Sequence, residues 1–205
     1  EDPDVKCLVV SGAGDKSFVA GADISEFEKA RSDANAAAEY ARISSEGKEA
    51  LKNFAKPSIS MIQGYCLGGG MEVALSTDFR ICSEDSQLGI PAARLSIAYS
   101  FDAIHRLCSL VGPSCAKDIL ITARRIKAPE ALRIGLVNQI TSLAGLEEEV
   151  AEYTQAILEN APLSMQASKL TVDEILKNPA DRNLAAIEEI GKTCFNSKDY
   201  REGRT

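Results

Sequence analysis

The chain has no tryptophan, a single histidine and only 5% aromatic residues in its 205 positions. One histidine, together with six cysteines that show no CxxC spacing, argues against a zinc site, which needs closely spaced ligands. The cysteines stand mostly among apolar neighbours, so we expect reduced, buried thiols. No apolar stretch approaches the roughly 20 residues of a membrane span. We therefore expect no metal and no membrane partner.

Basic charge is also scarce. The 23 Lys and Arg residues are outnumbered by 30 Asp and Glu residues, which gives a net charge of −7. A nucleic-acid surface would be basic, so we expect no nucleic-acid partner. The apolar share of 45% and the length are those of a globular protein with one full core. We expect a cytoplasmic protein, or one of the mitochondrial matrix if the source is eukaryotic.

What the chain does have is an alternation of strands, glycine turns and helices. We predict a buried strand at Val5–Val10, strands at 59–63 and 79–82, and helices at 34–54 and 70–76. This order predicts an α/β layer architecture with parallel strand pairing.

Helical patterns dominate from Asp102 onward, and we expect Asp102 to cap the helix that it precedes. Two apolar stripes have helical spacing, and we expect both to stay uncovered within one chain because no strand follows them. Their members are Leu146, Val150, Tyr153 and Ile157, and then Leu184, Ile187, Gly191, Cys194 and Phe195.

Two glycine-centred segments, SFVAGADI at 17–24 and GYCLGGGME at 64–72, describe one site. Three consecutive glycines permit close backbone approach and unusual dihedral angles. A helix that begins there points unpaired N–H groups outward, where they can hold an oxygen on which negative charge develops. A second N–H donor near Ala22 would complete an oxyanion hole for an enolate or a tetrahedral intermediate.

Glu72 is the leading catalytic candidate because it lies one helical turn after Gly69 and carries a carboxylate suited to proton transfer. Asp23 opens a D-x-x-E capping box, which suffices to explain it. His105 and Cys108 could formally form a nucleophile–base pair, but a helix-surface or satisfied interior position is favoured. The chain has no GxSxG elbow and no complete dinucleotide-binding glycine motif.

At these two segments the chain resembles the enoyl-CoA hydratase/isomerase (crotonase) family. The resemblance continues in the family's order through 56–64, 78–82, 88–91 and 131–137. It implies a crotonase-like ββα superhelix with a core at 1–140 and a C-terminal helical oligomerisation region at 141–205. It also implies a homotrimer or homohexamer, and opening strands and a basic coenzyme A segment that this chain lacks.

The function implied by the resemblance is action on an acyl-CoA thioester, with no cofactor because coenzyme A is part of the substrate. The N–H groups of Ala22 and Gly69 would bind the thioester oxygen, and Glu72 matches one of the family's two catalytic glutamates. The implied acyl-CoA-binding positions are Ala20, Ala22, Asp23, Ile24, Gly68, Gly69, Pro91 and Ala92.

The second catalytic glutamate of the family is absent, because Ala92 stands at its position. Tyr99 or Asp102 could supply another polar group, or Glu72 could act alone. An enoyl-CoA hydratase/isomerase-like lyase is the favoured function. The alternatives are a non-catalytic acyl-CoA-binding or assembly subunit and a decarboxylase or thioesterase of the same family.

Overall fold

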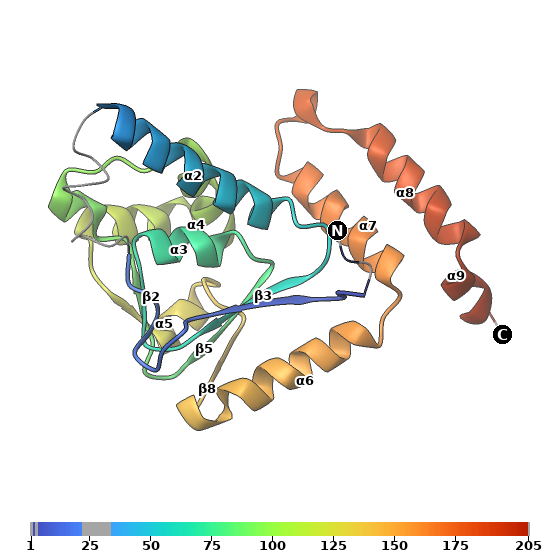
Figure 1. The fold of residues 1–205 in the computed structure, drawn as a ribbon, viewed down its shortest axis with the longest axis horizontal. Coiled ribbons are helices and arrows are strands. Elements are labelled where there is room, and N and C mark those ends of the chain that lie inside the picture. The colour runs from blue at the N-terminus through green and yellow to red at the C-terminus, as the bar shows by residue number, and fades with distance from the viewer. Residues whose placement is uncertain (1, 3, 22–33, 205) are drawn as a thin grey trace. The chain divides into compact units, whose positions relative to one another are not determined.

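The protein is described by a computed structural model that covers residues 2, 4–21 and 34–204 (Figure 1). Its chain forms two compact units: residues 9–54 with 58–150, and residues 1–8, 55–57 and 151–205. The larger unit carries all the described candidate site residues. The expected division between a core at 1–140 and a helical region at 141–205 stays a prediction. No helix in the described ranges is both long and apolar enough to cross a membrane.

The first sheet has the strand order β1-β3-β5-β8. Strand β3 pairs in parallel with β5, placing Ile59 opposite Phe79, and β5 pairs in parallel with β8. The predicted strands at 59–63 and 79–82 are thus confirmed within one residue at each end. The bounds are β1 Leu8–Ser11, β3 Ser58–Ile62, β5 Phe79–Ser83 and β8 Gln139–Thr141.

Strand β1 differs from the prediction in extent and burial. It begins at Leu8, three residues later than expected, and Val9 is an exposed residue within it. The reason is its place in the sheet, because β1 is an edge strand, whereas β3 and β5 have neighbours on both sides. The prediction of a buried strand at Val5–Val10 is therefore wrong in both respects.

The second sheet has the order β2-β4-β6-β7 and consists of very short strands. Strands β2, β4 and β6 run parallel, while β7 pairs antiparallel with β6. The expected α/β architecture with parallel pairing is confirmed by both sheets. The bounds are β2 Ser17–Val19, β4 Tyr65–Leu67, β6 Gln87–Gly89 and β7 Ile126–Lys127.

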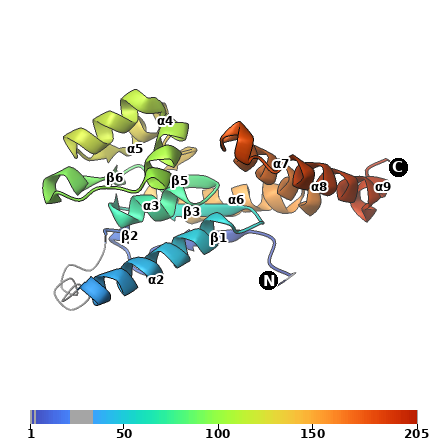
Figure 2. The same ribbon diagram turned by 90° about the horizontal axis from the view of Figure 1, so that it is seen from above.

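Three helices of the larger unit lie on one side of the first sheet, with α3 between α2 and α4 (Figures 1 and 2). The short helix α3 has a buried apolar face that includes Met71 and Leu75. The predicted helices at 34–54 and 70–76 are confirmed. The bounds are α2 Ala34–Lys52, α3 Gly69–Leu75, α4 Phe101–Thr122, α5 Ala128–Arg133, and the 3₁₀ turns η2 Pro91–Leu95 and η3 Leu143–Gly145.

Of the two apolar stripes expected to stay uncovered, the one on α8 is partly exposed and the one on α6 is mostly buried. On α6, Leu146, Val150 and Ile157 are buried within this chain, contrary to the expectation that this stripe stays uncovered. Helix α8 has no fully buried residue, and Leu184 and Phe195 are largely exposed. The bounds are α6 Leu146–Leu158, α7 Pro162–Ile175, η4 Pro179–Asp181, α8 Leu184–Asn196 and α9 Lys198–Glu202.

The cysteines are free, but they are not uniformly buried. Cys66 and Cys82 are fully buried, and the other four are partly exposed. Burial raises the pKa of the Cys82 thiol to about 12, with a further contribution from the charge of Asp85. The expectation of buried thiols therefore holds for the two cysteines that lie on central strands.

Candidate active site

Three segments singled out by the sequence meet at one edge of the second sheet. Because β2, β4 and β6 are parallel neighbours, the residues that follow them share the carboxyl edge. Ala20 follows β2, Gly68 follows β4, and Pro91 comes two residues after β6. The Gly68 N–H donates to the Gly89 carbonyl at 2.9 Å, which ties the β4 and β6 ends together. The fold thus assembles segments that are distant in sequence.

Each glycine of the GGG segment is required, or tolerated, for a different structural reason. Gly68 has a φ of +56°, in the region that favours glycine. A Cβ atom on Gly70 would lie 2.1 Å from the Val19 carbonyl oxygen, so Gly70 lets α3 pack against β2. A Cβ atom on Gly69 would meet no described atom within 4 Å. Gly69 is therefore the glycine that faces open space.

The Gly69 N–H belongs to the first turn of α3, where backbone donors lack partners within the helix. In the described part of the chain it has no recorded backbone partner. This suits the predicted role as one oxyanion donor. Ala22, Asp23 and Ile24 lie outside the described residues, so the second donor, the capping box and the shared oxyanion geometry stay predictions.

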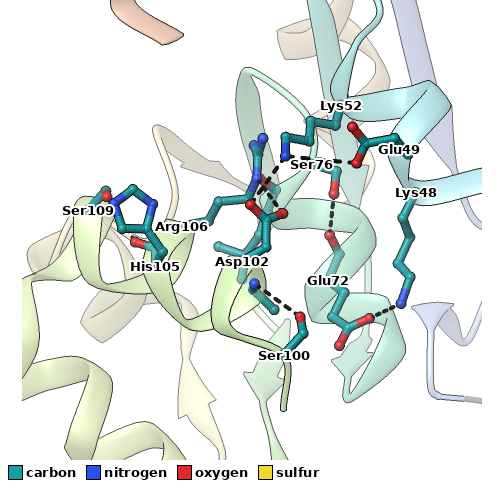
Figure 3. A network of polar contacts seen from close by, with 12 residues as sticks. Lys48, Glu49, Lys52, Glu72, Ser76, Ser100, Asp102, His105, Arg106 and Ser109 are labelled. Carbon is teal, nitrogen blue, oxygen red and sulfur yellow. Dashed lines mark hydrogen bonds and ion pairs between the residues drawn. The ribbon is translucent and has the colours of Figure 1, made fainter. Parts of the chain in front are cut away.

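Glu72 lies on α3, one turn after Gly69, and its side chain is 17% exposed. The Lys48 ammonium on α2 donates to Oε2 of Glu72 at 2.5 Å (Figure 3). Among the described residues, none bonds to the other carboxylate oxygen, Oε1. A pair this exposed typically contributes only about 0–1 kcal/mol to stability. Glu72 therefore retains one oxygen that can accept a proton.

Asp102 does not cap α4, contrary to expectation. Ser100 is the N-cap, and its side-chain oxygen accepts from the Ala103 N–H at 3.3 Å. Asp102 lies in the first turn and pairs with Lys52 at 3.2 Å and with Arg106 at 3.6 Å. Figure 3 shows its carboxylate turned toward these two side chains, while Glu72 points toward Lys48. Asp102 is paired with the Lys52 and Arg106 cations and is therefore a poor candidate for the second acid of the reaction.

Tyr99 is better placed than Asp102 to supply a second polar group. Its hydroxyl lies 3.7 Å from the point where a Cβ atom on Gly68 would stand. Burial raises the pKa of the Tyr99 phenol above its ordinary value, and the negative charge of Glu72 raises it further. The phenol is therefore a neutral hydrogen-bond donor near Gly68.

Ala92 and His105 show no polar role. Ala92 lies in the 3₁₀ turn η2, is 8% exposed and belongs to the hydrophobic core. The His105 ring stacks on Phe101 with centroids 5.9 Å apart, and no hydrogen bond between His105 and Cys108 is recorded among the described residues. The nucleophile–base pair has no support in this geometry.

Lys48 is the residue that sequence reasoning missed. It and Lys52 are four residues apart on α2, and such residues share one helix face. That spacing signals a charged face, but only the fold shows that the two lysines reach different acidic partners.

The match to known proteins covers the whole chain. Residues 1–205 match the family model described as enoyl-CoA hydratase/isomerase. The chain is 37% identical over 205 residues to a crotonyl-CoA hydratase of Syntrophomonas wolfei, covering 100% of this chain and 78% of that protein. It is 36% identical over 204 residues to a short-chain-enoyl-CoA hydratase of Clostridium acetobutylicum, covering 100% and 77%.

The chain belongs to the enoyl-CoA hydratase/isomerase family. A crystal structure of a member of this family from Hyphomonas neptunium superimposes with a TM-score of 0.92 at 30% identity, covering 99% of this chain and 77% of that one. The expected crotonase-like α/β fold is therefore confirmed, and activity of the hydratase type is supported at the level of the family.

Proposed function

We propose that this family member adds water to, or removes it from, a short-chain acyl-CoA thioester through an enolate. The observation that carries the proposal is the Glu72 carboxylate. One of its oxygens has no bonding partner among the described residues, and it lies one turn from the Gly69 N–H, which has no backbone partner in the described ranges. The similarity to proteins named crotonyl-CoA and short-chain-enoyl-CoA hydratase supports the choice of substrate class.

In the proposed reaction the N–H groups of Gly69 and Ala22 hold the thioester oxygen. Glu72 takes a proton from water as the water oxygen bonds to the β-carbon, and negative charge moves onto the thioester oxygen as an enolate. Collapse of the enolate then requires a proton at the α-carbon. We propose that acyl-CoA contacts Ala20, Ala22, Asp23, Ile24, Gly68, Gly69, Pro91 and Ala92.

The missing second carboxyl group leaves the source of the α-carbon proton to another group. We propose Tyr99, because its neutral phenol lies beside Gly68, whereas Asp102 is held by two cations. Transfer of the phenol proton to the α-carbon is balanced by return of the water proton from Glu72 to the phenolate. The site is thereby restored after each turnover.

A second candidate function is favoured by Ala92 itself. A member that lacks one acid could bind acyl-CoA without turnover, as a binding or assembly subunit. In either case we propose a homotrimer or homohexamer, supported by the largely exposed apolar residues Leu184 and Phe195 on α8.

A hydration assay with crotonyl-CoA, combined with calorimetric binding of the saturated analogue butyryl-CoA, distinguishes these functions. We expect both binding and hydration. Binding of butyryl-CoA without turnover of any member of an enoyl-CoA panel would instead identify a non-catalytic subunit. Release of carbon dioxide or free coenzyme A from other thioesters would indicate a decarboxylase or a thioesterase.

A further inference from the structure

Two lysines on α2 reach two acidic side chains on different helices. Lys48 bonds to Glu72 of α3, and Lys52, one turn later, pairs with Asp102 of α4 (Figure 3). In each pair a lysine of α2 supplies the ammonium group, and each pair is partly exposed. Only the Lys48 pair includes the proposed catalytic carboxylate. Each is therefore the control for the other.

The contact between Lys48 and Glu72 is directional. Lys48 is recorded on Oε2 alone, at 2.5 Å, which leaves Oε1 without a bonding partner among the described residues. A carboxylate held through one oxygen has restricted rotation about its last side-chain bonds, so its other oxygen points in a defined direction. Because α3 also begins at the open Gly69, the free oxygen and the N–H donor are fixed on the same short helix.

We infer that Lys48 is a positioning residue that holds Oε2 of Glu72 so that Oε1 faces the water molecule that attacks the β-carbon. This inference rests on the proposed function, and it assigns a role to a residue that the family motifs in this sequence do not include. Lys48 touches no reacting atom and transfers no proton. Misplacing a reacting group by about 1 Å can cost up to about 100-fold in rate, so the loss of such a contact has a measurable cost.

The first experiment detects the contact without any turnover. A water-soluble carbodiimide joins a carboxylate to an amine in direct contact as an amide, with loss of one water. Peptide mass spectrometry of the full chain should find Lys48 coupled to Glu72. This coupled peptide should disappear in Lys48→Met and persist in Lys52→Met. Absence of the coupling in the wild-type protein, while Lys52 couples to Asp102, would overturn the inference.

The second experiment separates positioning from a merely structural role. Lys48→Met should lower kcat for crotonyl-CoA hydration by about 10- to 100-fold, with KM and butyryl-CoA affinity nearly unchanged. Lys48→Arg should restore part of kcat because it keeps a cation at Glu72. Lys52→Met should leave kcat close to the wild-type value. Equal effects of both Met variants on kcat, or no rescue by Lys48→Arg, would contradict the inference.

The two proposals fail in different ways. A wild-type protein that shows the Lys48–Glu72 coupling but hydrates no enoyl-CoA would refute the proposed function and leave the contact established. A wild-type protein that hydrates crotonyl-CoA at the same rate as Lys48→Met would refute the inference about Lys48 and leave the function intact.

Discussion

Two glutamates on helices of this chain are each held by a lysine, yet their surroundings differ. Glu72 of α3 bonds to Lys48 through one oxygen, and its side chain is 17% exposed. Glu174 of α7 is 5% exposed; its Oε1 accepts from Lys177 at 2.6 Å, and its Oε2 accepts from the Asn183 N–H at 2.7 Å. The first carboxylate keeps a free oxygen among the described residues, whereas the second uses both.

The difference separates a side chain available for chemistry from one that stabilises the fold. Glu174 joins the end of α7 to the start of α8, and its two bonds satisfy a nearly buried group. Glu72 lies one helical turn after Gly69 on α3, and its negative charge contributes to the raised pKa of the Tyr99 phenol. Proximity to a lysine does not distinguish these two glutamates. They differ in how many carboxylate oxygens accept a hydrogen bond.

The largest change should come from restoring the second acid beside Glu72. Ala92→Glu should raise crotonyl-CoA hydration by about 10²–10⁴-fold, because one positioned acid or base is typically worth that much. Ala93→Glu places the same charge one residue away at an exposed position and should not raise the hydration rate. Steady-state kinetics of both variants measure the effect.

Ala92 is buried, so the variant needs a folding control. Circular dichroism melting and butyryl-CoA binding identify a variant that is folded and competent to bind. If such a variant gains no hydration, the segment around Tyr99 has reshaped the site for other chemistry. If the wild-type protein already hydrates at full hydratase rates, a group already present, with Tyr99 the first to test, fully replaces the missing acid.

Removing the Tyr99 phenol should have the next largest effect. Tyr99→Phe should lower kcat at least about 10-fold, toward the lower end of the range for general acids. Because the pKa of Tyr99 is raised, the phenol stays protonated through neutral and mildly alkaline pH, and the loss should not vary with pH there. Tyr65→Phe removes a phenol away from the proposed site and serves as the control. Equal kcat values for Tyr99→Phe and wild type would remove Tyr99 from the mechanism.

Substitutions at the neighbouring residues Gly69 and Gly70 should affect different properties, activity at Gly69 and stability at Gly70. Gly70→Ala should destabilise the protein by about 1–3 kcal/mol or more, because the new Cβ atom would overlap the Val19 carbonyl oxygen. Gly69→Ala should change stability by less than about 0.5 kcal/mol, because its Cβ atom enters open space, but should lower kcat/KM. Denaturant unfolding and hydration kinetics test the pair. An unchanged kcat/KM in Gly69→Ala would contradict the proposed place of the thioester oxygen.

The smallest effect concerns acid stability at Glu174. The Lys177 ammonium, and then the Asn183 N–H, lower the pKa of Glu174 below its ordinary value of 4.5. A lowered carboxyl pKa stabilises the fold above pH 4.5, and this contribution is lost as pH falls through the folded-state pKa. Glu174→Gln should therefore be less stable than wild type at pH 7, by a margin that shrinks below pH 4.5. Glu188→Gln, at an exposed position on α8, should show no such margin.

Several elements could be predicted from the sequence because their signals are local. The GGG segment and the apolar residues after it placed the start of α3 within one residue, and Pro57 limited the end of α2. The segments at 59–63 and 79–82 predicted the central strands. A central parallel strand is buried on both faces, so its sequence need not alternate between apolar and polar residues. The motif around Glu72 likewise predicts a site at the start of α3, and the catalytic role of Glu72 stays a prediction.

Other features depend on contacts that local patterns do not encode. Strands β2, β4 and β6 have three residues each, which is too few to show the alternation of apolar and polar residues that predicts a strand. Ser100 and Asp102 are both good capping residues, and only the backbone decides between them. The pairing of Lys48 with Glu72 joins residues 24 positions apart on two helices, so it depends on how α2 packs beside α3.

The most direct test of the account is the hydration rate of Glu72→Gln measured alongside its butyryl-CoA affinity and melting temperature. Glutamine keeps the shape of the side chain but cannot take a proton from water. We predict a fall in kcat of about 10²–10⁴-fold with unchanged affinity and nearly unchanged stability. A Glu72→Gln protein that hydrates crotonyl-CoA at the wild-type rate would contradict the central claim that the Glu72 carboxylate takes the proton from water.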